Sequence, residues 1–177
     1  RELARAIQSL REQGAYMLVL DLRGDGGGLV QSAVEVVGQF IDYGLAYREL
    51  SKDGRERRHA VPLDTQKTDW PLVVLVDGGT ASSAEIVAAA IQDHQRGVLI
   101  GTPTFGKGSM QSIIQLSDGS SIHVTSSRWL SPQGRPIEGL GLQPDLWVPS
   151  ATDAQGNDIA LQRAVDYLEH KFSEVQE

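Results

Sequence analysis

The chain contains no cysteine among its 177 residues, which excludes disulfide bonds, thiol catalysis and cysteine-ligated zinc. It also lacks an apolar run of about 18 residues, the length that spans a bilayer as a helix. Basic residues are outnumbered, since 16 Lys and Arg stand against 23 Asp and Glu, giving a formal net charge of −7. Because nucleic-acid binding needs clustered cations against phosphate, we expect no nucleic-acid partner.

Histidine is scarce as well, and none of the four histidines is placed for conventional serine catalysis. A Ser-His-Asp triad needs a histidine that a carboxylate orients. A helix of about 12 residues would carry His94 about 18 Å from Ser82. Of the other three, His59 lies on a charged hairpin, His123 in the middle of a strand and His170 near the C-terminus. There is no Gly-x-Ser-x-Gly or His-x-x-x-His motif, and we expect neither a metal site nor a cofactor.

The composition is that of a globular domain, with 40% apolar and 22% charged residues. We expect a catalytic-core domain over residues 1–150, followed over 151–177 by a linker and an amphipathic helix that packs on the core. The chain opens at Arg1 inside an apparent helix, without a Met or a leader segment. It is therefore expected to be a piece of a longer protein.

Apolar strands alternate with glycine turns and helices, a pattern typical of a mostly parallel sheet covered by helices. Buried strands are expected at residues 16–22, 72–76 and 97–100, and helices at 3–10, 29–43, 82–93 and 157–172. The last helix should bury Ile159, Leu161, Ala164, Val165 and Leu168. Antiparallel hairpins are expected over 45–61 and 112–129. The basic residues near the first hairpin's tip, 55–59, are expected to be solvated.

Three loops follow the predicted parallel strands, at residues 24–28, 78–83 and 101–107. In open parallel sheets, ligands bind beyond the carboxyl ends of the strands. We therefore expect the three loops to converge on one edge and to form a single site.

The loop at 78–83 leads into a helix through Ser82, with Glu85 three positions further on. This spacing is typical of a helix-capping box. A serine at a helix N-terminus is also a plausible nucleophile, because the helix dipole favours an alkoxide and an oxyanion. Lys107, between two glycines, could serve as its base if its ammonium is desolvated. Ser82 alone leaves capping and catalysis equally open.

The other two loops have alternative interpretations. Residues 24–28 (GDGGG) form either a tight glycine turn or a backbone that approaches an anion closely, with Asp25 as a turn residue. Residues 101–107 nearly match a phosphate-binding loop. However, Gly108 stands where a magnesium-binding Ser or Thr belongs, and a hairpin follows instead of a helix. Phosphate binding is therefore disfavoured.

Taken together, these segments closely resemble the carboxyl-terminal processing, or tail-specific, proteases. The resemblance rests on residues 21–29 (DLRGDGGGL), 79–82, 85–88, 92–94, 104–111 (TFGKGSMQ), 116–119 and 139–145, and covers about residues 15–148. It implies an α/β fold, with a layered core of the Clp protease and crotonase type and a smaller part rich in β-hairpins.

The resemblance also implies a serine endopeptidase with a Ser-Lys dyad. Residue by residue, it makes Ser82 the nucleophile, Lys107 the general base and Gln111 a residue that orients the lysine. The oxyanion hole would comprise the backbone amides of Gly28 and Ser83, with Asp93 structural. For activity near neutral pH, burial must lower the pKa of Lys107.

One departure from the family concerns the residues after the nucleophile. The family usually has Ala-Ser where this chain has Ser83 and Ala84, which leaves Ser83 open as an alternative nucleophile. Because the hole needs only the backbone amide at position 83, the change should be tolerated. Thr102 replaces a common acidic residue, with no evident consequence.

The resemblance implies protein or peptide substrates with free apolar carboxyl termini, and a periplasmic or otherwise exported location. A homo-oligomer, an adaptor protein and peripheral membrane association stay open. Family members normally carry a PDZ module, and no segment of that size is present here. Two other functions also remain: a non-catalytic ligand- or peptide-binding module of the same fold, and a crotonase-like acyl-CoA enzyme, which would need acid–base carboxylates such as Asp25 or Glu85 near the hole.

Overall fold

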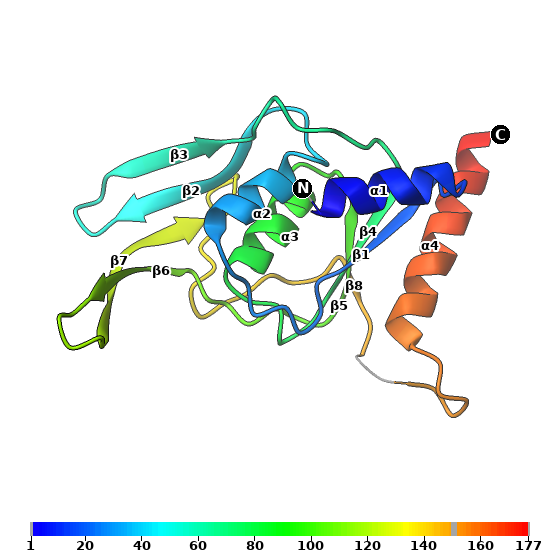
Figure 1. Cartoon of the computed structure of the whole chain (residues 1–177). Helices are drawn as coiled ribbons and strands as arrows, with labels where there is room; N and C mark the ends of the chain where they lie inside the picture. The colour runs from blue at the N-terminus through cyan, green and yellow to red at the C-terminus, as the bar shows by residue number, and fades with distance from the viewer. Residues whose placement is uncertain (1, 150–151, 177) are drawn as a thin grey trace.

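The computed structural model describes residues 2–149 and 152–176. The expected boundary between positions 150 and 151 lies outside these residues. The elements run α1 (Glu2–Glu12), β1 (Leu18–Asp21), α2 (Val30–Val37), β2 (Leu45–Ser51), β3 (Glu56–Ala60), β4 (Leu72–Val76), α3 (Ser83–Asp93), β5 (Val98–Gly101), β6 (Ser109–Gln115), β7 (Ser121–Leu130), β8 (Leu146–Trp147) and α4 (Ile159–Gln176) (Figure 1).

A parallel sheet forms the centre of the molecule, with strand order β1-β4-β5-β8. All five side chains of β4 are buried, as expected for a strand covered on both faces. One face packs against α2 and α3, and the other against α4 through Ala160, Ala164 and Leu168. The α/β prediction is confirmed. The short strand β8 was missed, because two residues within a loop rich in Gly and Pro carry no readable periodicity.

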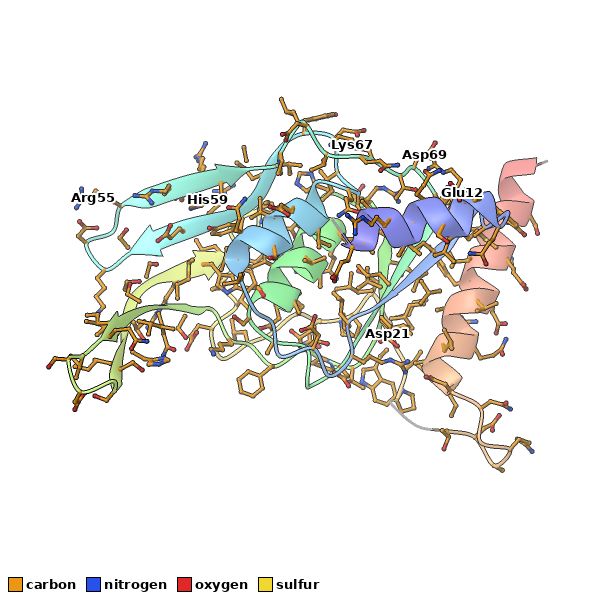
Figure 2. All side chains as sticks on the ribbon, viewed as in Figure 1. Glu12, Asp21, Arg55, His59, Lys67 and Asp69 are labelled. Carbon is orange, nitrogen blue, oxygen red and sulfur yellow. The ribbon has the colours of Figure 1, made fainter. Side chains whose placement is uncertain are left out.

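A second sheet is antiparallel and has the order β3-β2-β7-β6. It consists of the two predicted hairpins, which project from the same side of the molecule (Figure 1). Arg55 lies at the tip of the first hairpin (Figure 2), and its side chain is 85% exposed. The basic residues there are therefore largely solvated. His59 is the exception, since its ring stacks on Tyr47 and contacts Glu49 at 3.0 Å.

The helix expected over residues 29–43 is shorter than predicted, because α2 ends at Val37. Its last turn tightens into bonds from Gln39 N to Val36 O and from Phe40 N to Val37 O. Lys67 Nζ donates to the carbonyl oxygens of Gly38 and Ile41 and so satisfies groups that a longer helix would use. Phe40 and Ile41 remain buried, which is why the apolar pattern continued beyond the helix.

The C-terminal helix α4 buries a narrower stripe than expected. Ala160, Ala164 and Leu168, spaced four residues apart, face the sheet, while Leu161 is 41% exposed. The prediction that Leu161 is buried was therefore wrong. Among the described residues, no helix is both long enough and apolar enough to cross a membrane.

Candidate active site

The three loops meet at the carboxyl edge of the parallel sheet, as predicted. Gly24 N donates to Asp77 Oδ1 at 2.9 Å, and Ala81 N donates to the Asp25 carbonyl oxygen at 2.9 Å. Phe105 N, in the third loop, donates to the Thr80 carbonyl oxygen at 3.0 Å. The central loop, between β4 and α3, thus holds both neighbours by backbone hydrogen bonds.

Ser82 occupies a strained turn at the start of α3. Its φ of 56° and ψ of −121° lie in a region that L-residues rarely adopt, and among the described non-glycine residues only Gln95 shares a positive φ. Such strain costs on the order of 1–3 kcal/mol and is concentrated at functional sites. In α/β-hydrolases a sharp turn from strand to helix presents the nucleophilic serine, within a Gly-x-Ser-x-Gly motif that this chain lacks.

Glu85 joins the loop of Ser82 to the loop of Lys107. Its fully buried carboxylate accepts hydrogen bonds from Ser82 N and Lys107 N, both at 2.9 Å, on Oε2. On Oε1 it accepts bonds from Gly106 N at 2.8 Å and from the Thr104 hydroxyl. The capping-box spacing anticipated only the bond to Ser82. The bonds to the lysine loop were not predicted, because they join residues that lie far apart in the sequence and depend on how the loops pack.

Ser82 and Lys107 line one cavity of about 330 Å³, together with Gly28 and Gln111. The structure thus brings the predicted nucleophile, base and orienting residue to one place. No hydrogen bond joins Ser82 to Lys107 among the described contacts. Lys107 and Gln111 are both exposed, whereas the dyad chemistry was expected to need a buried lysine. The lysine therefore still faces solvent in this structure.

The Ser83 hydroxyl lies against the Gly-rich loop. Ser83 is 5% exposed, and its Oγ accepts a hydrogen bond from Gly28 N at 2.7 Å. One of the two amides expected to form an oxyanion hole is therefore occupied by a side chain. The amide of Ser83, in the first turn of α3, has no intrahelical acceptor.

Gly27 explains why this loop can approach the helix so closely. Its φ is +88°, and a Cβ there would lie 2.7 Å from the Ala81 carbonyl oxygen and 2.9 Å from Ser83 N. Both contacts are shorter than real Cβ atoms show, so only glycine fits.

The polar residues predicted to be structural do make structural contacts. Asp25 accepts a hydrogen bond from Gly27 N at 2.9 Å, as a turn residue does. The Asp93 carboxylate pairs with Arg135 and accepts from Gln133 N at 2.8 Å. His94 bonds to the Leu45 carbonyl oxygen at 2.8 Å, at the far end of α3. These groups are therefore engaged in holding the fold.

His123 is a residue that sequence reasoning set aside and that the structure brings to the site. It lines the same cavity as Ser82, opposite Ile113 in the β6–β7 ladder. Its position mid-strand gave no signal, because the pairing of the hairpin decides which face it occupies. No group of His, Asp and Glu side chains among the described residues is arranged to hold a metal ion.

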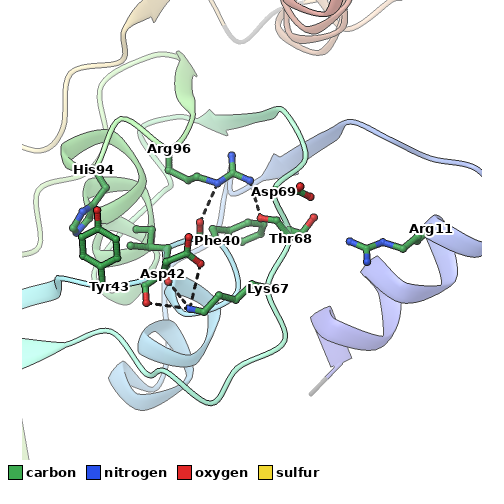
Figure 3. Close-up of a pocket in the computed structure, with 10 residues that line it drawn as sticks. Arg11, Phe40, Asp42, Tyr43, Lys67, Thr68, Asp69, His94 and Arg96 are labelled. Atoms are coloured by element: carbon green, nitrogen blue, oxygen red, sulfur yellow. Dashed lines mark hydrogen bonds and ion pairs between the residues drawn. The ribbon is translucent and has the colours of Figure 1, made fainter.

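A second cavity, of about 640 Å³, lies near the end of α3 remote from Ser82 (Figure 3). Two of the cations that line it, Lys67 and Arg96, donate hydrogen bonds to backbone carbonyl groups. Arg96 donates to the carbonyl oxygens of Phe40 and Thr68, both at 2.9 Å, and Lys67 donates to that of Ile41 at 2.8 Å. Burial lowers the pKa of Arg96. Arg96 and Lys67 are therefore engaged in holding the surrounding loops in place.

Comparison with known proteins places the chain in a family. Residues 1–148 match the model of peptidase family S41, and the chain belongs to that family. A carboxyl-terminal-processing protease of Synechocystis sp. is 39% identical over 173 residues, which cover 95% of this chain and 40% of that protein. The carboxy-terminal processing protease CtpA of Bacillus subtilis is 38% identical, over 82% of this chain and 31% of that protein.

Solved structures agree with the family. The photosystem II D1 C-terminal processing protease superposes with a TM-score of 0.75 at 37% identity, over 86% of this chain and 40% of that one. A putative S41 protease from Bacteroides fragilis, with a TM-score of 0.77 at 18% identity, covers 96% of this chain and 49% of that one and shares the fold. The chain spans less than half the length of each of these relatives.

Proposed function

We propose that the protein is a serine endopeptidase that cleaves proteins near their carboxyl termini with a Ser82–Lys107 dyad. The observation that carries the proposal is the placement of a strained serine and a lysine on one cavity, with one buried carboxylate bonded to both backbones. Membership of family S41 supports it independently.

In the proposed mechanism, Ser82 Oγ attacks the scissile carbonyl carbon while Lys107 Nζ takes the hydroxyl proton. The oxyanion is stabilised by the amides of Ser83 and Gly28, which point near the N-terminus of α3. Lys107 returns the proton to the leaving amine as the peptide C–N bond breaks. It then takes a proton from the water that attacks the acyl carbonyl carbon, and passes it to Ser82 Oγ as the acyl–oxygen bond breaks. Gln111, four residues beyond the lysine on β6, orients the amine.

Two features of the resting site must change for this chemistry. Lys107 has to lose water so that its neutral form is populated near pH 7. The Gly28 amide has to be released by the Ser83 hydroxyl, which holds it at 2.7 Å. Substrate binding is proposed to supply both changes.

The substrates are proposed to be polypeptides with a free apolar carboxyl terminus, and the location to be an exported compartment. The names of the relatives support the first part, since several are called carboxyl-terminal processing proteases. Two relatives are named as chloroplastic. A crotonase-like reaction is not favoured, because the carboxylates of Asp25 and Glu85 are both bonded to backbone amides.

The test is hydrolysis of a peptide with a free apolar carboxyl terminus, compared with its carboxyl-amidated copy. Ser82→Ala and Lys107→Arg should each lower kcat by about 10⁴-fold or more, with unfolding midpoints unchanged. Arginine keeps the charge but cannot accept the serine proton. Activity in Lys107→Arg, or loss of activity in Ser83→Ala with Ser82→Ala still active, would overturn the assignment.

A further inference from the structure

The antiparallel sheet, β3-β2-β7-β6, has two edge strands that differ in charge. The edge strand β3 (ERRHA) carries Glu56, Arg57 and Arg58, and charged residues are a common means of protecting an edge against pairing. The other edge strand, β6 (SMQSIIQ), contains no charged residue and no proline. Its residues 111–115 are all exposed. Strand β6 is therefore an open edge that lacks protection by charge.

The pairing with β7 determines which backbone groups of β6 face outward. Trp129 N donates to the Gly108 carbonyl oxygen, and Leu116 N donates to that of Ser120, so positions 108 and 116 face β7. The register shifts between Met110 and Gln111, but the extra residue, Ser126, lies on β7 and leaves the alternation along β6 intact. Positions 110, 112 and 114 therefore also face β7. The N–H and C=O groups of Ser109, Gln111, Ile113 and Gln115 therefore point to the open edge.

These outward positions are also the ones next to the catalytic cavity. Ser109, Gln111 and Ile113 line it together with Ser82 and Lys107. The open edge begins two residues after the proposed base. A polypeptide laid along this edge would thus run past Lys107 and Gln111, both of which are exposed to solvent in the free chain.

We propose that an extended segment of the protein substrate binds as an added strand on the edge of β6. This inference rests on the proposed function and names how its substrate is held. Main-chain hydrogen bonds to residues 109, 111 and 113 hold the segment, and alternate side chains face the cavity. The added strand covers Lys107 and Gln111, so that binding removes water from the base. The site is completed by its substrate.

The experiment measures binding to the Ser82→Ala protein, which cannot turn the substrate over. The ligands are fluorescent peptides of one apolar-tailed sequence, each with a single N-methylated amide, compared by fluorescence anisotropy. Methylation should weaken binding by about 3- to 10-fold at every second position near the scissile bond, and much less between. Uniform effects, or no binding by any peptide, would overturn the proposal.

Two variants of β6 provide an independent test in the active protein. Ile113→Pro removes an outward N–H and the side chain, while Ile113→Ala removes the side chain only. We expect kcat/KM to be about 3- to 10-fold lower in the proline variant than in the alanine variant. Equal values in two folded variants would contradict the added strand. If Ile113→Pro unfolds, the peptide series still decides.

Hydrogen exchange of the free protein tests whether a second copy or another segment already covers the edge of β6. Fast exchange is expected at the amides of Gln111, Ile113 and Gln115, and slow exchange at Ser112 and Ile114. Protection of the outward amides without peptide would show that a second copy or another segment covers the edge, and would overturn the proposal. Hydrolysis with no alternation in binding refutes the added strand alone, whereas absence of hydrolysis refutes the proposed function.

Discussion

Ser82 follows a strand whose five side chains are buried, whereas Lys107 precedes a strand whose last five residues are exposed. The serine stands at the carboxyl edge of the parallel sheet, which helices cover on both faces, and at the N-terminus of a buried helix. The lysine stands at the root of a hairpin with an open edge. If the proposed roles hold, folding alone positions the nucleophile, while a bound substrate completes the environment of the base. Substitutions near Ser82, and at Glu85, which bonds to both loops, test this comparison.

The largest effect on stability is expected at Glu85, because its carboxylate bonds to both the Ser82 loop and the Lys107 loop. Glu85→Gln places an amide NH₂ where backbone N–H groups of both loops need an acceptor. We expect a loss of about 2–4 kcal/mol in the free energy of unfolding, measured with denaturant, together with a lower kcat. Glu169→Gln, on the exposed side of α4, is the matched control and should change unfolding by less than about 0.5 kcal/mol. Equal, small effects would refute the link.

A second change acts on the nucleophile side alone. Gly27→Ala introduces a Cβ at a position where φ is +88° and where the Ala81 oxygen lies 2.7 Å away. It should displace the Ser82–Ser83 peptide and lower kcat by about 100-fold. Gly14→Ala is a sharp control, because Gly14 has a φ of +87° and nothing within 4 Å of its Cβ position. That control should cost about 1 kcal/mol of stability and leave kcat unchanged.

A smaller effect, of opposite sign, is expected at Ser83. Ser83→Ala removes the hydroxyl that occupies the Gly28 amide, so that the substrate no longer competes with it. We expect kcat/KM to rise by up to about 10-fold, because the substrate then no longer has to break the hydrogen bond between Gly28 N and Ser83 Oγ. Ser83→Thr keeps the hydroxyl and serves as the control. A decrease in Ser83→Ala would mean that the hydroxyl assists catalysis directly.

The smallest effect on stability is expected for the ion pair of Arg23 with Asp158, which does not involve Ser82, Lys107 or Glu85. The hydrogen bond from Arg23 lowers the pKa of Asp158, which lies just before α4. A lowered carboxyl pKa stabilises the fold above the unfolded value of about 3.9, and this contribution is lost as the pH falls through the folded value. Asp158→Asn should cost about 0.5 kcal/mol near pH 7, because the pair is partly screened by solvent.

The pH dependence of Asp158→Asn identifies the cause. The difference in unfolding free energy between wild type and variant should be constant above about pH 5 and shrink toward zero below about pH 3. Asp64→Asn, at an exposed carboxylate, should give no such change. A difference that persists in acid would show that the variant acts through packing instead of charge.

Much of the fold was readable from the sequence, because the strands of the parallel sheet are continuous apolar runs and both hairpins carry turn signals. The convergence of the three loops followed from the rule for parallel sheets. The end of α2 and the burial of α4 were wrong in detail, since Lys67 and the small stripe of Ala160 and Ala164 act through tertiary contacts. A pattern of apolar residues does not distinguish a buried helix from a buried turn.

Four of the five predicted site residues share one cavity, whereas Ser83 is not among the residues that line it, and the catalytic roles of all five stay predictions. Ser82, Lys107, Gln111 and Gly28 do line one cavity. The link through Glu85, the occupied Gly28 amide and the presence of His123 were missed, because each depends on a contact between segments far apart in the chain. The exposure of Lys107 was missed for the same reason, since it depends on which strand edge remains open.

The central claim is that Ser82 is the nucleophile and Lys107 its base. The most direct measurement is trapping of the acyl-enzyme from an apolar-tailed peptide substrate, followed by mass mapping of the modified residue. The account predicts an acyl group on Ser82 that is absent in both Ser82→Ala and Lys107→Arg. An acyl group on Ser83, or one that forms at the wild-type rate in Lys107→Arg, would contradict it.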